Sequence, residues 1–146
     1  MNSRWIIMWV SIILAQVVVA ANAPIQRIDV ANMLVSGGSV TAVVVSFSNG
    51  VPTPCFTKTL AYLEEITVWA GTGQVCITPI SSVTITPVAG SGGAMYDTPA
   101  VPISVSNTLY STQIKISENT PPIFDSNNGS LLMAGTLQAV VFNNLR

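Results

Sequence analysis

The chain contains no histidine, and this limits the chemistry that its side chains can perform. Histidine is the commonest general base at neutral pH and a usual ligand of catalytic zinc. Without it, the Ser/His/Asp and Cys/His mechanisms of nucleophilic catalysis are not available. The residue types left for chemistry are acidic, cysteine and aromatic side chains. We expect a protein that is not an enzyme, with no catalytic residue, no cofactor and no metal ligand.

The acidic residues show no pattern for general acid–base catalysis. Glu64 and Glu65 are adjacent, so on a strand they point to opposite faces, and on a helix they lie about 100° apart. Neither geometry gives a facing pair of carboxyl groups, as glycoside hydrolysis needs. The others occupy expected turns or strand ends, where they cap or turn the chain. These are Asp29, Asp97, Glu118 and Asp125.

A polar segment over 125–129 has the composition of a calcium loop. An EF-hand loop requires glycine at its sixth position and a carboxylate at its twelfth, where this chain has Ser130 and Thr136. A polar turn is therefore the better interpretation. Within it, Asn128-Gly129-Ser130 fits the acceptor triplet for N-glycosylation, which matters only in a host that glycosylates.

Aromatic side chains offer a platform on which a carbohydrate or a peptide could stack. Trp69 comes shortly before a Gly-Thr-Gly turn, and an indole beside such a turn suits stacking. The alternative, packing in the core, is the more common fate of aromatic rings. The candidate contacts for a ligand or a partner are Trp69, Tyr96 and Tyr110, with Tyr62 as a further platform residue.

The first 23 residues have the pattern of a secretory signal peptide. A positive residue precedes an apolar run over Trp5–Leu14, and small residues follow at Val18–Ala20. We predict cleavage after Ala20, with Ala23 as a second site, and export to the periplasm or the cell exterior. The alternative is an uncleaved membrane anchor, for which the apolar stretch is barely long enough and contains Gln16.

Cys55 and Cys76 are the only cysteines, and both follow the leader. In an oxidising compartment an even number of cysteines usually pairs. The loop so closed would contribute roughly 3 kcal/mol in the chain-entropy model. A reactive thiol is the alternative, and Lys58 near Cys55 could favour a thiolate. Because Cys76 lies in an apolar, strand-like context, we predict a structural disulfide.

Charged residues make up only 8% of the chain, against about 25% in an average soluble domain. The formal net charge is −1. No basic stripe is present to neutralise phosphates, so we do not expect nucleic-acid binding. Copies of so weakly charged a surface repel one another little, which makes a homo-oligomer physically accessible.

Short segments rich in β-branched residues recur after the leader, separated by turn residues. Ser39–Phe47 is the clearest, and its two apolar faces indicate a central strand. Leu109–Ile116 and Leu131–Phe142 are further strands, the last with a bend at Gly135. The segment 57–66 fits either a strand or a short helix.

This spacing of strands and turns predicts an all-β fold. We expect residues 21–146 to form a single antiparallel β-sandwich, or a barrel, of about seven or eight short strands. The only helix considered is the short one near 57–66. One disulfide, Cys55–Cys76, would close the domain.

Two functions are compatible with these features. The first is an exported, non-catalytic binding or surface module, whose ligand or partner is a carbohydrate or a protein. The second is a structural subunit that assembles by β-strand addition, as pilin-like proteins do. A closed sandwich favours the first function, and an open groove or a long exposed edge strand favours the second. In both, the membrane is contacted only through the leader.

Overall fold

The computed structural model describes residues 25–89, 95–106 and 111–144, which form ten β-strands and no helix. The strands are β1 Gln26–Asn32, β2 Val40–Ser48, β3 Val51–Leu60, β4 Glu65–Ala70, β5 Ile80–Pro87, β6 Val101–Ser104, β7 Ser111–Thr120, β8 Ile123–Phe124, β9 Leu131–Met133 and β10 Thr136–Asn144. The leader over 1–20 and its cleavage lie outside the described residues and stay predictions.

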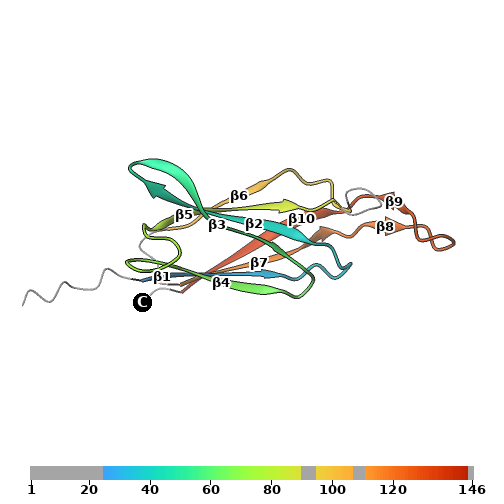
Figure 1. Ribbon diagram of the computed structural model, residues 1–146. Coiled ribbons are helices and arrows are strands. Elements are labelled where there is room, and N and C mark those ends of the chain that lie inside the picture. The colour runs from blue at the N-terminus through green and yellow to red at the C-terminus, as the bar shows by residue number, and fades with distance from the viewer. Residues whose placement is uncertain (1–24, 90–94, 107–110, 145–146) are drawn as a thin grey trace, which may run out of the picture.

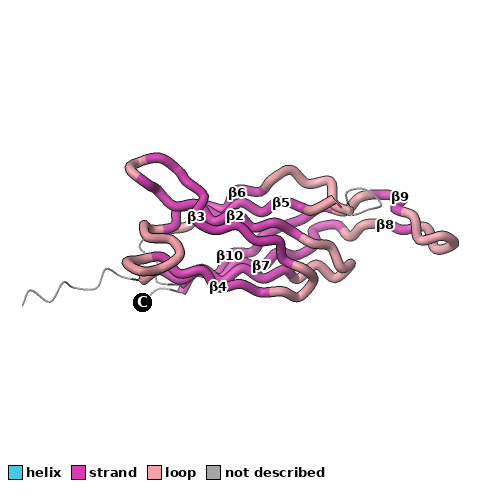
Figure 2. The backbone as a smooth tube through the Cα atoms, viewed as in Figure 1, coloured by secondary structure: helices cyan, strands magenta, loops and turns pink. Residues whose placement is uncertain are grey.

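Eight of the strands build two four-stranded sheets that pack face to face (Figures 1 and 2). Sheet A has the strand order β10-β7-β1-β4, and sheet B has the order β3-β2-β5-β6. The strands β8 and β9 form a separate ribbon that projects from one end of the sandwich (Figure 1). We call this the ribbon end and the opposite end, where β1 begins, the terminal end. The predicted all-β sandwich is confirmed, without closure of the described sheets into a barrel.

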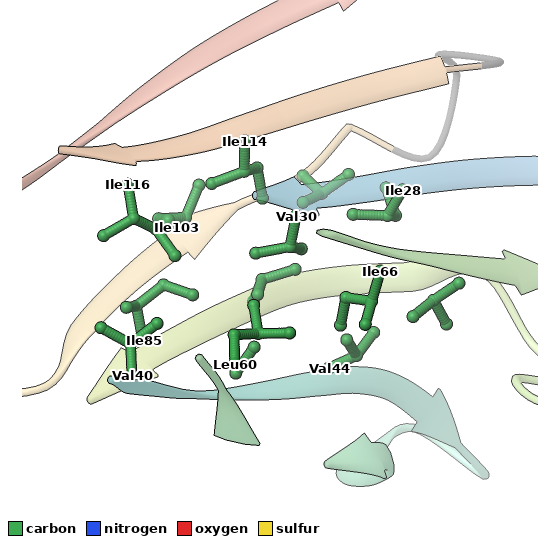
Figure 3. Close-up of a cluster of buried hydrophobic side chains, with 14 of the residues drawn as sticks. Ile28, Val30, Val40, Val44, Leu60, Ile66, Ile85, Ile103, Ile114 and Ile116 are labelled. Carbon is green, nitrogen blue, oxygen red and sulfur yellow. The ribbon is translucent and has the colours of Figure 1, made fainter. Parts of the chain in front are cut away.

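The core lies between the sheets and is built from alternate residues of each strand. In β2, Val40, Ala42 and Val44 point inward and are fully buried. From sheet A, Ile28 and Val30 of β1 face them (Figure 3). Burying β-branched and aliphatic side chains stabilises a fold by about 1.5–3 kcal/mol each. The position of β2 between β3 and β5 confirms that Ser39–Phe47 contains a central strand.

Strand β1 lies in the middle of sheet A, antiparallel to β4 and parallel to β7. Sheet A is therefore mixed rather than purely antiparallel, and only its two outer pairs are antiparallel. A parallel pair requires a long connection between its strands. Here that connection is the whole of sheet B together with β4, which places two segments far apart in sequence side by side.

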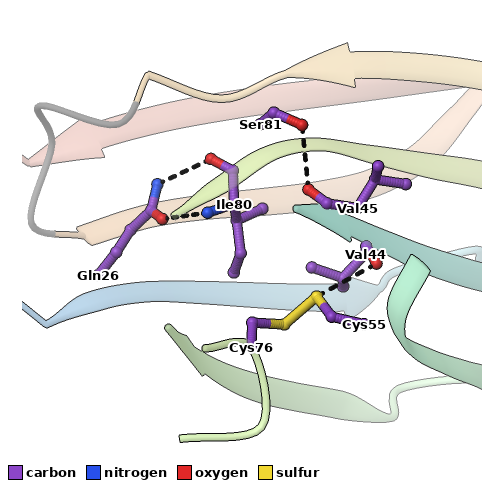
Figure 4. Close-up of a disulfide and its surroundings, with 7 residues drawn as sticks. All are labelled: Gln26, Val44, Val45, Cys55, Cys76, Ile80 and Ser81. Atoms are coloured by element: carbon purple, nitrogen blue, oxygen red, sulfur yellow. Dashed lines mark hydrogen bonds between the residues drawn. A yellow bond between two sulfur atoms is a disulfide. The ribbon is translucent and has the colours of Figure 1, made fainter. Parts of the chain in front are cut away.

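A buried amide side chain stands at each end of β1. Gln26 is 4% exposed, accepts a hydrogen bond from the backbone N–H of Ile80 at 2.7 Å and donates to its carbonyl at 3.3 Å (Figure 4). Asn32 is fully buried and donates to the carbonyls of Gly38 and Leu60 at 2.8 and 3.1 Å. Because a buried amide requires fixed partners, these bonds set the register of β1 against sheet B.

The short helix considered over 57–66 is absent, and this expectation is wrong. Strand β3 continues to Leu60, which pairs with Val40 of β2. A tight turn follows, closed by a 3.0 Å hydrogen bond from Glu64 N–H to the Ala61 carbonyl. Leu63 has φ of 59°, a left-handed conformation that no right-handed helix contains.

The final predicted strand, Leu131–Phe142, is divided in two at Gly135. Residues before it pair with β8, and residues after it pair with β7. A Cβ atom at Gly135 would lie 2.4 Å from the carbonyl oxygen of Thr120 and 2.7 Å from the nitrogen of Pro122. The close backbone approach at this point therefore requires glycine, and the chain changes partner there.

Candidate functional site

The most varied surface chemistry of the described residues lies on the outer face of sheet A. Because Ile28 and Val30 point into the core, Arg27 and Asp29 of β1 point outward. The register with β4 places Trp69 beside Arg27. The guanidinium carbon of Arg27 lies 5.5 Å from the centroid of the Trp69 ring, within the range of a cation–π contact.

Asp29 is held on this face by two neighbouring side chains. Its carboxylate accepts a hydrogen bond from the Thr67 hydroxyl at 2.6 Å and from Arg27 Nε at 3.0 Å. Its side chain is almost buried between its neighbours, whereas that of Arg27 is 41% exposed. The aspartate therefore orients the arginine, and the arginine orients the indole.

A second pair of cationic and aromatic side chains extends the outer face of sheet A across β7 and β10. Lys115 of β7 lies opposite Val140 of β10, and Gln113 lies opposite Phe142. The Lys115 ammonium is 5.3 Å from the centroid of the Phe142 ring. Two cation–aromatic pairs thus stand at opposite margins of one pleated surface, with polar side chains between them.

This arrangement offers a contact surface of aromatic and charged side chains. Trp, Phe and Arg are the side chains that contribute most to protein interfaces, and here their conformations are fixed by contacts within the sheet. The described residues contain no cluster of three or more His, Cys, Asp or Glu side chains that could hold a metal ion. Every buried polar side-chain atom of the described part has a hydrogen-bond partner.

The outer face of sheet B is different in character. Its outward residues are threonine, serine, valine and proline, with the exposed Phe47 at the terminal end of β2, and Thr41 and Thr59 share a hydrogen bond of 3.1 Å between their hydroxyls. No charged or large aromatic side chain lies in the central rows of this face. It offers little that could select a partner.

The structure separates the aromatic candidates. Trp69 is partly exposed on the outer face of sheet A, and Tyr62 is exposed in the turn before β4. Tyr96 is only 3% exposed and packs in the core, so its ring is not accessible to a surface ligand. Tyr110 lies outside the described residues.

Tyr96 has a structural partner in Glu118. Its hydroxyl donates to the Glu118 carboxylate at 2.7 Å, and the backbone N–H of Ser36 donates to the same oxygen at 2.8 Å. Burial and the neighbouring carboxylate raise the pKa of Tyr96 above its ordinary range. Burial alone would raise the pKa of Glu118, but the bonds from Tyr96 and Ser36 outweigh it and the pKa is lowered.

The remaining candidate carboxylates are not brought together. Glu64 forms an ion pair of 2.5 Å with Lys58, and this bond is the main reason that the pKa of Glu64 is lowered. Glu65 begins β4 and is exposed. Asp125 accepts a hydrogen bond from the backbone N–H of Asn127 at 2.8 Å, as expected for a polar turn.

The predicted disulfide is confirmed. Cys55 and Cys76 are bonded, with their Cα atoms 5.3 Å apart (Figure 4). Cys55 belongs to β3 of sheet B, and Cys76 forms a bridge with Ala70 at the end of β4. The bond therefore joins the two sheets. A disulfide of this kind is typical of an oxidising, exported environment.

The sequence did not indicate four of the residues on this face as contacts for a partner, namely Arg27, Asp29, Lys115 and Phe142. A local signal existed in Arg27-Ile28-Asp29-Val30, where charged and aliphatic residues alternate as in a half-buried strand. Their aromatic neighbours come from strands distant in sequence, so only the register of the sheet shows the pairs.

No known protein family, curated protein or solved structure matches this chain. Within the described residues, no helix is long and apolar enough to cross a membrane. The functional argument therefore depends on the chemistry of the surface.

Proposed function

We propose that this protein is an exported, non-catalytic surface module that binds a protein partner through the outer face of sheet A. The observation that carries the proposal is the paired arrangement of Trp69 with Arg27 and of Phe142 with Lys115. Only 8% of the residues in the chain are charged. Four of the described ones lie on this face, namely Arg27, Asp29, Glu65 and Lys115. The disulfide and the predicted leader support a periplasmic or extracellular location.

Site-specific photo-crosslinking in the organism that makes the protein tests this proposal. A photoreactive amino acid would replace Glu65, an exposed residue of edge strand β4 on the outer face of sheet A. The matched control would replace Thr57, an exposed threonine of edge strand β3 on the outer face of sheet B. We expect an adduct at position 65, none at position 57, and loss of the adduct in Trp69→Ala.

Equal adduct formation at both positions, or none at position 65, would contradict a binding role for this face. Attachment to polysaccharide in place of protein would keep the face and change the class of partner. The isolated partner can then be titrated by intrinsic fluorescence. After cleavage of the leader, which contains Trp5 and Trp9, Trp69 is the only tryptophan and reports directly on this face.

A second function, a structural subunit that assembles by β-strand addition, is favoured by a different observation. The edge strand β10 is nine residues long and contains neither proline nor a charged residue. Long edges of this kind are usually protected in proteins that stay monomeric. The first function uses side chains on the outer face of sheet A and the second uses the backbone edge of β10, so the two are compatible in one molecule.

A further inference from the structure

The four outer edges of the two sheets differ in how they are protected against pairing with another chain. Strand β3 carries Pro52 and Pro54 and a register shift opposite them, and strand β6 has only four residues, one of them Pro102. Strand β4 has six residues and begins with a charged side chain, Glu65. Proline, charge, bulges and short length are the usual means of protecting an edge. Only β10 combines length with the absence of proline and charge.

Strand β10 also exposes apolar side chains in the middle of the molecule. Val140, Val141 and Phe142 are 40, 38 and 46% exposed. The other exposed large apolar side chains of the described part lie at the ribbon end and the terminal end. A run of three consecutive exposed apolar residues on a strand is uncommon on a monomeric surface.

The exposure of Val141 follows from the lengths of the facing strands. Val141 pairs with the buried Ile114, so it points toward sheet B. The edge strand of sheet B on this side is β6, which has four residues against nine in β10. Within the described residues, part of the inner face of β10 therefore has no strand over it, and both faces of β10 present apolar surface.

We propose that β10 pairs in antiparallel orientation with β10 of a second copy, which joins two copies of sheet A into one eight-stranded sheet. The proposal deepens the second of the two proposed functions and rests on it. A two-fold axis at Val140, the middle residue of the strand, would place Val140 opposite its own copy. It would also place Ala139 opposite Val141 and Gln138 opposite Phe142. In this register the backbone of Gln138 to Phe142 finds partners, whereas the start of β10 is already covered, because the Leu137 N–H donates to the Thr98 hydroxyl.

The occupant is a second copy because the strand is complementary to itself. With no charge in β10, the two-fold axis brings no like charges into direct contact. The nearest charges are the two Lys115 side chains, each one strand away from the seam. They would stand three strand spacings apart, about 14 Å, which exceeds the Debye length of about 8–10 Å at physiological salt. Their repulsion across the seam is therefore weak.

Light scattering after size-exclusion chromatography of the oxidised, exported protein tests the pairing over a hundredfold range of concentration. We expect a dimer that dissociates on dilution. Val140→Lys would place two lysines opposite each other at the seam and raise the dissociation constant at least tenfold. The control Leu132→Lys changes an equally apolar, 65% exposed residue of the ribbon and should leave the dimer unchanged. A wild-type protein that is monomeric at every concentration would overturn the proposal.

A cysteine variant tests the register without relying on repulsion. Directly opposed residues of antiparallel strands have Cα atoms about 4.5–5.5 Å apart, within the range that a disulfide spans. Val140→Cys should therefore form a covalent dimer at least tenfold faster than Leu132→Cys, with the new bond mapped by mass spectrometry. Equal rates would contradict the pairing, even for a variant that has lost stability. Failure here leaves the photo-crosslinking result at Glu65 unaffected, so the two proposals fail separately.

Discussion

The two long sides of the sandwich are closed by different means. On one side, β3 of sheet B meets β4 of sheet A, and the disulfide Cys55–Cys76 joins them near the terminal end. Toward the ribbon end, Lys58 of β3 forms an ion pair with Glu64 in the turn before β4. The β3/β4 side is therefore linked at both of its ends, once by a covalent bond and once by an ionic one.

Among the described residues, the β6/β10 side is tied near the ribbon end. Near the ribbon end, Tyr96 forms a bridge with Gly135, and the Thr98 hydroxyl accepts a 2.9 Å hydrogen bond from the N–H of Leu137. Beyond this point the short β6 ends, and β10 continues with Val141 exposed on its inner face. The β3/β4 side, with its disulfide and its ion pair, stabilises the fold, and the β6/β10 side leaves surface for association. One side of the fold is thus available for contacts without weakening the other.

The largest loss of stability should follow from removing the disulfide of the β3/β4 side. Replacing both cysteines, Cys55→Ala with Cys76→Ala, removes a cross-link with a sequence separation of 21 residues. The chain-entropy model gives a loss of roughly 3 kcal/mol in the free energy of unfolding. Urea denaturation would measure it, with wild-type protein before and after reduction as the control. A loss below about 1 kcal/mol would show that this side does not depend on the disulfide.

The hydrogen bond from Tyr96 to Glu118, near the ribbon end of the β6/β10 side, should make the next largest contribution to stability. Tyr96→Phe keeps the aromatic ring packed against Gly38 and removes the hydroxyl that donates to Glu118. Loss of a hydrogen bond to a charged group costs about 1.5–3 kcal/mol, reduced here because Ser36 still donates to the carboxylate. We expect about 1.5 kcal/mol by urea denaturation. Tyr62→Phe, at an exposed position, is the matched control and should cost nearly nothing.

The same comparison explains how much of the fold the sequence could predict. Strand β2 was predictable because both its faces are apolar and its residues are β-branched. Strand β1 was less clear because Gln26 and Asn32 place polar side chains at core positions, where an apolar residue is expected. Their partners, Ile80 and Leu60, are distant in sequence. Only the assembled sandwich shows that these amides are satisfied.

The candidate site was likewise predictable only in part. The sequence indicated Trp69 because it is an aromatic residue near a turn, and the structure places it on the outer face of sheet A. Its partner Arg27 is 42 residues away in sequence (69 minus 27), and only the β1–β4 register brings the two together. Tyr96 is of the same aromatic type, but its hydroxyl finds Glu118 and its ring enters the core. Residue type alone does not distinguish these two outcomes.

The response to pH should be confined to the acidic and alkaline limits, because the chain has no histidine to titrate near neutrality. The pKa of Glu118 is lowered in the fold, so its stabilisation is present above its ordinary value of 4.5 and is lost as pH falls. The pKa of Tyr96 is raised, so its stabilisation is present below 10 and is lost as pH rises further.

Thermal unfolding across pH 3–11 would check these signs. We expect a flat midpoint between about pH 6 and 9 and a decline on each side. Tyr96→Phe should make the alkaline decline shallower, and Glu118→Gln should do the same for the acidic decline. An alkaline decline that is unchanged in Tyr96→Phe would assign it to other tyrosines.

The smallest effect should come from the ionic link of the β3/β4 side. The side chains of Lys58 and Glu64 are 44% and 33% exposed, so water and salt screen their attraction. Exposed pairs of this kind contribute little, so Lys58→Ala should lower the free energy of unfolding less than the disulfide and Tyr96 variants do. Urea denaturation at low and high salt measures this, with wild-type protein under the same conditions as the control. A loss close to that of the disulfide variant would mean that the turn before β4, and not the covalent bond, holds this side together.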